Sequence, residues 1–419
     1  MTVANLLVIY TKIILRNERM NDKSTKVLYV TALLSRDWGG GEPLVARKTI
    51  ELLKNLGYNV VSVFYKSKLG YLFTRISGPL RAIFPSSDSW IFSYMYYKKV
   101  IEKENPNVII AQYDYDSSII KAAVNQRKRV IAYVHIWWPI CPKITLFTYD
   151  NQICSGFTGN NCKICLLHSV ESKSIFDWVS KRVLFLLKNS MIHKKMKNRI
   201  NFLNRDNVTI AVLSSRMKAF LVGNGLSPEK IRIIPNSVSC EEFYPNDITR
   251  EKIVGYYGGE SHLKGYEVFL KVAETIKARY PDVRFLAAGY FKNKSPFVEF
   301  IGSLTHAQVA ELMGKSLCTV IPSITEETFN LVALESMATG TPPVAFDVGI
   351  LKSIILDNET GFIVPVMAIN DMINRIIDIL TDDRLFLRLS KNSRIVACEF
   401  TENKRIDLLN KIILESERL

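Results

Sequence analysis

Two carboxylates, Glu327 and Glu335, lie eight positions apart where a loop is expected to become a helix. The apolar run 317–322 predicts a buried strand before them, and residues 331–338 carry apolar side chains at helical spacing. Such acids could hold hydroxyl groups of a ligand whose phosphate sits at the helix start. Two glutamates on a helix are more often solvated surface residues. Because Glu335 interrupts an apolar run, however, we expect it to have a partner.

The start of this helix offers a phosphate site. Thr328 is the expected N-cap, which would leave the amides of Phe329, Asn330 and Leu331 free. Glu335 would then lie roughly two turns inside, about 10 Å along the axis. One ligand could place phosphate on the amides and ribose hydroxyls on Glu335. Gly340 is expected to end the helix, because prolines follow it.

The stretch 322–345 resembles the E-x7-E segment of the retaining GT-B glycosyltransferases, in particular glycosyltransferase family 4. The resemblance continues through residues 347–350 and 358–365 and covers most of the second half of the chain. The family usually has Gly where this chain has Asn330, whose side chain narrows the space there.

The length and the order of the elements also indicate two domains, because 419 residues exceed one ordinary core. Apolar, β-rich runs predict strands separated by helices in both halves. They lie at 26–34, 59–65, 108–112, 129–134, 208–214, 231–235, 283–288, 298–301, 318–321 and 343–346. This alternation predicts an α/β protein with two Rossmann-like, doubly wound parallel sheets facing a cleft. The resemblance implies that these two domains form the GT-B fold.

The expected domain boundaries follow from this pattern. Residues 1–19 would be an N-terminal extension, with an interfacial anchor as the alternative, because the order of basic and apolar residues does not fit a signal peptide. Residues 20–245 would form the acceptor-side domain and 246–395 the nucleotide-sugar domain. The resemblance implies that 396–419 form a helix crossing back to the first domain.

Lys264 is the first candidate for the donor diphosphate. It matches the family's Lys-Gly pair, whose lysine contacts donor phosphate, and it would act as a point charge on the leaving group. The family usually has an arginine where this chain has Gly259. Arg216, His262 or a basic residue of the first domain would have to substitute for it.

The resemblance also implies roles for the other site residues. His135 follows a predicted strand, and it would hydrogen-bond the sugar and polarise the site. Glu327 would orient sugar hydroxyls and favour positive charge at the anomeric carbon, and Glu335 would hold the ribose. Gly40 and Gly41 would let the substrate approach the backbone, with a simple tight turn as the alternative.

No metal or cofactor is expected for catalysis in this family. Asp114 and Asp116 spell D-x-D, but we interpret them as a polar strand end. Four other residues (Cys141, Cys154, Cys162 and Cys165) are clustered in one loop and could hold a structural zinc ion. Two disulfides or free thiols are the alternatives. Cys240, Cys318 and Cys398 are scattered and are expected to be buried thiols.

The net charge of +15 favours anionic partners: phosphorylated ligands, anionic lipid or nucleic acid. No nucleic-acid-binding motif is present, so we do not expect nucleic acid to be a partner. No apolar run is long enough to span a membrane. A basic helical stretch at 172–205 and an aromatic-rich region at 66–100 would suit an anionic membrane surface and a lipid-linked acceptor, with a solvated helix as the alternative.

Together these features predict a retaining hexosyltransferase of the EC 2.4 type. It would move sugar from a nucleotide-sugar donor to a glycan, polysaccharide or lipid-linked acceptor in the cytoplasm, at the inner membrane face. The alternatives are a sugar-nucleotide 2-epimerase on the same fold and an inactive nucleotide-sugar-binding protein. No motif reports the nucleotide, the sugar, the acceptor or the linkage.

Overall fold

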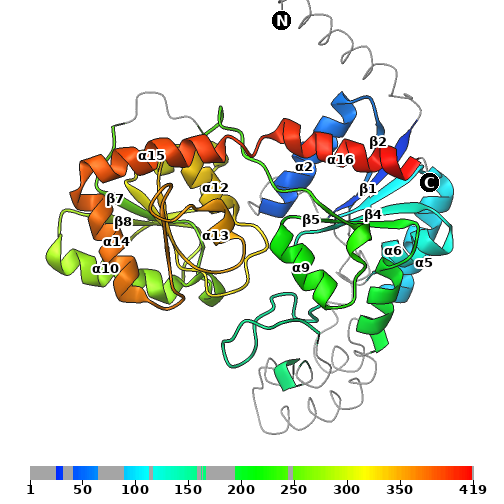
Figure 1. The fold of residues 1–419 in the computed structure, drawn as a ribbon, viewed down its shortest axis with the longest axis horizontal. Coiled ribbons are helices and arrows are strands. Elements are labelled where there is room, and N and C mark those ends of the chain that lie inside the picture. Colours follow the sequence, from blue (N-terminus) through cyan, green and yellow to red (C-terminus); the bar gives the residue numbers. More distant parts are fainter. Residues whose placement is uncertain are drawn as a thin grey trace, which may run out of the picture. The chain divides into compact units, whose positions relative to one another are not determined.

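The computed structural model describes residues 25–31, 41–64, 89–112, 117–157, 162, 164–166, 194–243 and 249–417. The predictions for residues 1–19, Gly40, Asp114, Asp116 and most of the 66–100 and 172–205 regions therefore lie outside the described residues. The chain divides into two compact units (Figure 1). The first contains residues 1–133, 201–210 and 408–419, and the second contains 134–200 and 211–407. The predicted domain boundaries at 245 and 395 stay predictions.

The first sheet has six strands in the order β2-β1-β3-β4-β5-β6. Their bounds are β1 (Lys26–Thr31), β2 (Asn59–Phe64), β3 (Val108–Ala111), β4 (Arg129–Val134), β5 (Val208–Val212) and β6 (Ile231–Ile233). Strand β1 pairs in parallel with β2 and with β3, and β3 pairs in parallel with β4. The chain positions of all six strands agree with the sequence prediction, because each strand is a short run of β-branched and apolar residues.

Helices connect these strands, as expected for parallel pairing. They are α2 (Gly41–Asn55), α5 (Ser89–Glu104), α6 (Ser118–Asn125), α9 (Ser215–Gly223) and the short 3-10 helix η1 (Pro228–Lys230). The last helix, α16 (Glu402–Glu417), ends in the first unit. There the Tyr58 hydroxyl donates a hydrogen bond to Asn410 Oδ1 at 2.5 Å.

The second sheet also has six strands, in the order β12-β11-β10-β7-β8-β9, and each strand is parallel to its neighbours. The strands are β7 (Ile253–Tyr256), β8 (Arg284–Ala288), β9 (Glu299–Gly302), β10 (Cys318–Ile321), β11 (Pro343–Phe346) and β12 (Phe362–Val364). Every residue of β7, β10 and β11 is buried. Burial on both faces is the reason why these strands read as continuous apolar runs.

The helices of this unit are α10 (Tyr266–Arg279), α11 (His306–Lys315), α12 (Leu331–Ala338), α13 (Leu351–Ile354), α14 (Ile369–Thr381) and α15 (Asp383–Ala397), with the 3-10 helix η2 (His262–Lys264) before α10. Helix α14 contacts α10 and α15, and α15 contacts α12 (Figure 1). Two α/β sheets of this kind confirm the predicted fold class.

Helix α12 ends beside a half-buried arginine, Arg250. Gly340 has φ +72°, as expected for the residue that ends a helix. Arg250 donates hydrogen bonds to Thr339 O at 2.7 Å and to Ser316 O at 2.8 Å. Its burial lowers the pKa of the guanidinium to about 10. The carboxyl end of α12 is thus anchored by a cation, which suits the negative end of the helix dipole.

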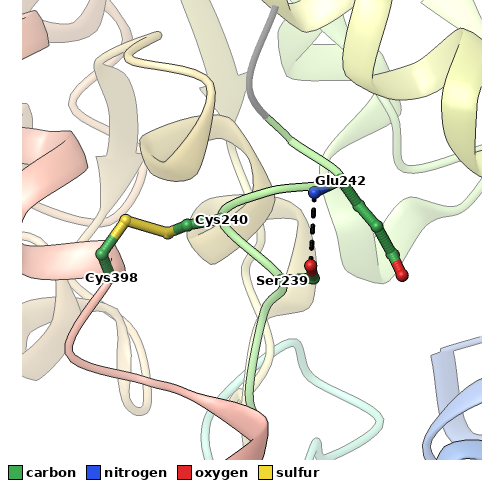
Figure 2. Close-up of a disulfide and its surroundings, with 4 residues drawn as sticks. All are labelled: Ser239, Cys240, Glu242 and Cys398. Carbon is green, nitrogen blue, oxygen red and sulfur yellow. Dashed lines mark hydrogen bonds between the residues drawn. A yellow bond between two sulfur atoms is a disulfide. The ribbon is translucent and has the colours of Figure 1, made fainter.

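A disulfide joins Cys240 to Cys398 across 158 residues (Figure 2). The same two segments are held together by Val238 N, which donates to Phe400 O at 2.9 Å. The prediction that both cysteines are buried thiols is therefore wrong, because partners this distant in sequence leave no local signal. Cys318 is a free, fully buried thiol as predicted, and burial raises its pKa.

Candidate active site

The loop that follows β10 leads to the start of α12, and Asn330 caps the helix there. The Asn330 side chain accepts a hydrogen bond from Ala333 N at 2.9 Å. The prediction that Thr328 is the N-cap is therefore wrong: both residue types can cap a helix, and the one two residues later does so. The helix starts at Leu331, so its first amides lack partners within the helix.

Asn330 also occupies the position where the family usually has Gly. The replacement of glycine by asparagine has a local structural reason, because the Asn330 side chain caps the helix. The later helix start changes the position of Glu335 as well. Glu335 lies four residues after Leu331, which is about 6 Å along the axis rather than the expected 10 Å.

Lys264 and Glu327 form an ion pair. Lys264 Nζ lies 2.7 Å from Glu327 Oε1, and the exposed fractions of the two side chains are 41% and 6%. Lys264 ends η2, and Gly265 follows it with φ +72°. A Cβ at Gly265 would collide with the Pro322 carbonyl oxygen, so only glycine lets this turn approach the loop before Glu327. The structure thus brings together two of the predicted site residues.

A second glycine seats the backbone of Glu327. Ile350 N donates a hydrogen bond to Glu327 O at 3.1 Å. Gly349 has φ +56°, and a Cβ there would collide with the same carbonyl oxygen. The loop after β11, which belongs to the family resemblance, therefore fixes the backbone of the first acid.

Thr328 contacts the residue that follows β4. Its hydroxyl donates a hydrogen bond to His135 O at 2.7 Å. His135 is 5% exposed. Burial, and next the positive charge of Arg405, lower the pKa of His135 to about 3. The imidazole is therefore neutral at physiological pH and can hydrogen-bond a ligand without carrying charge.

Glu335 lies one turn inside α12 and is 9% exposed. Its Oε1 lies 3.8 Å from Nε2 of His306, the first residue of α11. The His306 ring also packs edge-on against Phe243, with 5.7 Å between ring centroids. Glu335 is thus a buried carboxylate with a partner, as its apolar surroundings predict.

Glu326, the residue before Glu327, was not selected from the sequence. Its side chain is fully buried and receives two hydrogen bonds from Arg216, one of them between Nη2 and Oε2 at 2.9 Å. The hydrogen bond to Glu326 raises the pKa of Arg216. The sequence signal that could have identified Glu326 is its place in an acidic doublet between the apolar runs 317–322 and 331–334.

Gly41 and His262, two further residues considered for the site, have no contact with Lys264 or Glu327 among the interactions described above. Gly41 is the first residue of α2. His262 lies 3.4 Å from Glu267, and both side chains are exposed. A cavity of about 460 Å³ lies beside the loop after β11, lined by Asp347, Lys352, Asp357 and Glu359 and by apolar residues. Its lining includes none of the predicted site residues.

The four clustered cysteines are free thiols, and Cys141 and Cys162 are buried. Cys154 Sγ lies 3.3 Å from Gly156 O, and burial raises the pKa of this thiol. The described part of the chain, which includes all four, contains no group of three His, Cys, Asp or Glu arranged to hold a metal ion. The structural zinc site stays a prediction.

Two family models match consecutive parts of the chain. Residues 38–242 match the Glycosyltransferase Family 4 model, and residues 241–396 match the model of the glycosyl transferases group 1. The chain therefore belongs to the family 4, group 1 glycosyltransferases, and its two sheets form the GT-B fold.

Two curated relatives have partial matches. A phosphatidyl-myo-inositol mannosyltransferase of Mycolicibacterium smegmatis is 29% identical in an alignment of 169 residues, and the match covers 36% of this chain and 43% of the relative. A D-inositol 3-phosphate glycosyltransferase of Acidothermus cellulolyticus is 28% identical in an alignment of 171 residues, and the match covers 33% of this chain and 38% of the relative. The chain thus matches less than half the length of these relatives.

Two solved structures are similar in fold to nearly the whole chain. Sucrose-phosphate synthase from Thermosynechococcus elongatus has a TM-score of 0.64 at 19% identity, over 93% of this chain and 98% of that one. Anabaena Alr3699/HepE in complex with UDP-glucose has a TM-score of 0.65 at 14% identity, over 92% and 99%. None of the described helices is long and apolar enough to cross a membrane.

Proposed function

We propose that the protein is a retaining glycosyltransferase that moves a sugar from a nucleotide-sugar donor to a glycan, polysaccharide or lipid-linked acceptor. The observation that carries the proposal is the contact between Lys264 and Glu327 beside the start of α12. A cation and an acid at a helix N-terminus match the two charges that separate when a sugar–phosphate bond breaks.

Lys264 and the first amides of α12 stabilise the departing diphosphate. The bond between the anomeric carbon and the phosphate oxygen breaks, and its electron pair stays on the diphosphate, where Lys264 meets the growing negative charge. Because the lysine is partly exposed, donor phosphate can reach it and compete with Glu327 for it.

Glu327 faces the sugar. Its carboxylate accepts hydrogen bonds from sugar hydroxyls and favours positive charge on the anomeric carbon as that carbon becomes oxocarbenium-like. Glu335 accepts hydrogen bonds from the ribose. The imidazole of His135 hydrogen-bonds the sugar. Because its pKa is low, the ring carries no positive charge near neutral pH.

The acceptor oxygen bonds to the anomeric carbon on the face that the diphosphate leaves. Its proton passes to the departing phosphate, so charge and atoms balance without a protein base. Two relatives are named for inositol-containing acceptors, and the net charge of +15 favours an anionic surface. We therefore propose that the acceptor is phosphorylated or lipid-linked, and that the enzyme binds it at the cytoplasmic face of the membrane.

The test is release of nucleoside diphosphate from a panel of nucleotide sugars by the purified protein. Lys264→Ala and Glu327→Ala should each lose most of the turnover, whereas Lys271→Ala, from an exposed Lys271–Glu274 pair on α10, should keep it. Full activity of the first two variants would refute the site. A free monosaccharide formed without an acceptor would indicate the epimerase, and binding without turnover would indicate an inactive protein.

A further inference from the structure

The acid before Glu327 is more deeply buried than Glu327 itself. Glu326 has no exposed side-chain surface, whereas 46% of the Arg216 side chain is exposed. A carboxylate without access to water is costly unless a partner compensates its charge. Arg216 provides that compensation with two parallel hydrogen bonds, a geometry that fixes orientation as well as charge.

The backbone around Glu326 is held by further long-range contacts. Trp137 Nε1 donates a hydrogen bond to Glu326 O at 2.8 Å. On one side the Thr325 hydroxyl donates to Thr145 O at 3.0 Å. On the other side the Thr328 hydroxyl holds the carbonyl of His135. Ile350 N donates to Glu327 O at 3.1 Å, so residues 325–328, which we call the acid loop, are held at all four positions. Glu327 is the member whose side chain contacts Lys264.

We propose that Arg216 and Glu326 are positioning residues, whose ion pair fixes the acid loop so that Glu327 is presented to the donor sugar. This inference rests on the proposed function. The pair contributes through Glu327 and does not itself touch the substrate. Replacing Arg216 by lysine is not neutral here, because lysine lacks the planar fork that engages both carboxylate oxygens.

The competing role for Arg216 is that of the phosphate ligand missing at Gly259. The charges around the guanidinium oppose it. Glu326 occupies two of its donors, and the negative charge of Asp347 also acts on it. A diphosphate approaching Arg216 would therefore be repelled by two carboxylates. In the described part of the chain, Lys264 forms an ion pair with one carboxylate, that of Glu327.

The experiment compares Arg216→Lys, Glu326→Gln and the double variant in steady-state kinetics and in titration with nucleoside diphosphate. Both single variants keep a hydrogen-bonding group at the site, so that folding is preserved. The matched control is the exposed pair Arg284 and Glu299, which has the same two-bond geometry at 2.8 and 3.0 Å. Its variants are Arg284→Lys and Glu299→Gln.

We expect kcat to fall about 100-fold in each positioning variant, because a displacement of about 1 Å costs that much. The dissociation constant of nucleoside diphosphate should change less than about threefold, and the double variant should be no slower than the slower single variant. The control variants should keep wild-type kcat. Weakened diphosphate binding in Arg216→Lys, with normal kcat in Glu326→Gln, would overturn the proposal in favour of a phosphate ligand.

A second readout separates this inference from the proposed function. Amide hydrogen exchange in a peptide that covers residues 322–330 should be faster in Glu326→Gln than in the wild type and unchanged in Glu299→Gln. If the wild type turns over no nucleotide sugar, the proposed function fails while this measurement still tests the role of the pair. Unchanged exchange in Glu326→Gln would overturn the positioning role even in an active enzyme.

Discussion

Lys264 Nζ and Glu327 Oε1 lie 2.7 Å apart, although 63 residues separate them along the chain. The lysine ends η2, and the acid lies in the loop before α12. The two glycines at 265 and 349 permit this contact, since a side chain at either position would collide with the backbone of the loop. Lys264, the proposed ligand of the departing diphosphate, is thus in contact with Glu327, the proposed ligand of the sugar.

The first prediction concerns this ion pair. Glu327→Gln should lower kcat by about 100- to 1000-fold, the usual effect of removing one electrostatic contact to the transition state. It should not weaken binding of nucleoside diphosphate, because Lys264 no longer has an internal competitor. Kinetics and calorimetric titration of the same preparation check both parts. Lost diphosphate affinity in Glu327→Gln would contradict the assignment of the acid to the sugar.

The second prediction concerns Glu335 and the ribose. A hydrogen bond to a charged group contributes about 1.5–3 kcal/mol, so Glu335→Gln should weaken donor binding by roughly 10- to 100-fold. A deoxyribonucleoside diphosphate should bind the wild type more weakly than its ribose counterpart. The variant should have lost most of this discrimination. Equal discrimination in both proteins would show that Glu335 does not contact the ribose.

The third prediction follows from His135. Its pKa in the folded protein is about 3, below the ordinary value of 6.5, because burial disfavours the charged imidazolium. The unfolded chain therefore binds a proton that the folded protein rejects between pH 6.5 and about 3, and stability falls as the pH falls through this window.

From pH 7.5 to 5.5 this residue should lower the free energy of unfolding by about 1.4 kcal/mol. His135→Gln should lose that much less than the wild type over the same interval, since the other histidines are common to both proteins. Urea unfolding at the two pH values provides the measurement. An equal loss of stability in both proteins would contradict a neutral, buried His135.

The fourth prediction concerns the disulfide. The bond closes a loop of 158 residues, and such a cross-link should stabilise the protein by about 5 kcal/mol through the entropy of the unfolded chain. Cys240→Ser should therefore lower the melting temperature, and a reductant should lower that of the wild type but not that of the variant.

Thiol labelling gives an independent check of the same bond. The denatured, unreduced protein should react at five of its seven cysteines, and the reduced protein at all seven. Seven reactive thiols before reduction would show that Cys240 and Cys398 are not joined.

Much of the fold follows from local pattern. The strands at 318–321 and 343–346 are found where the sequence predicts them, and Gly340 ends α12 as expected. These features depend on residues within a few positions of one another: apolar runs for strands buried on both faces, and glycine for a left-handed backbone. Glu335 was also recognisable, because a carboxylate in an apolar run requires a partner.

The cap of α12 marks the limit of such reasoning. Thr328 and Asn330 are both good capping residues, and the choice between them depends on what else holds their side chains. The structure assigns the Thr328 hydroxyl to the carbonyl of His135, which leaves Asn330 to accept the hydrogen bond from Ala333.

The fold class, most strand positions and the two acids of the E-x7-E segment could be predicted from the order of the amino acids alone. The contacts of Arg216 with Glu326, of Cys240 with Cys398 and of Lys264 with Glu327 are known only from the three-dimensional packing. Secondary structure is encoded in the spacing of neighbouring side chains. Contacts between residues so distant along the chain depend on how whole elements pack, and no local pattern records that packing.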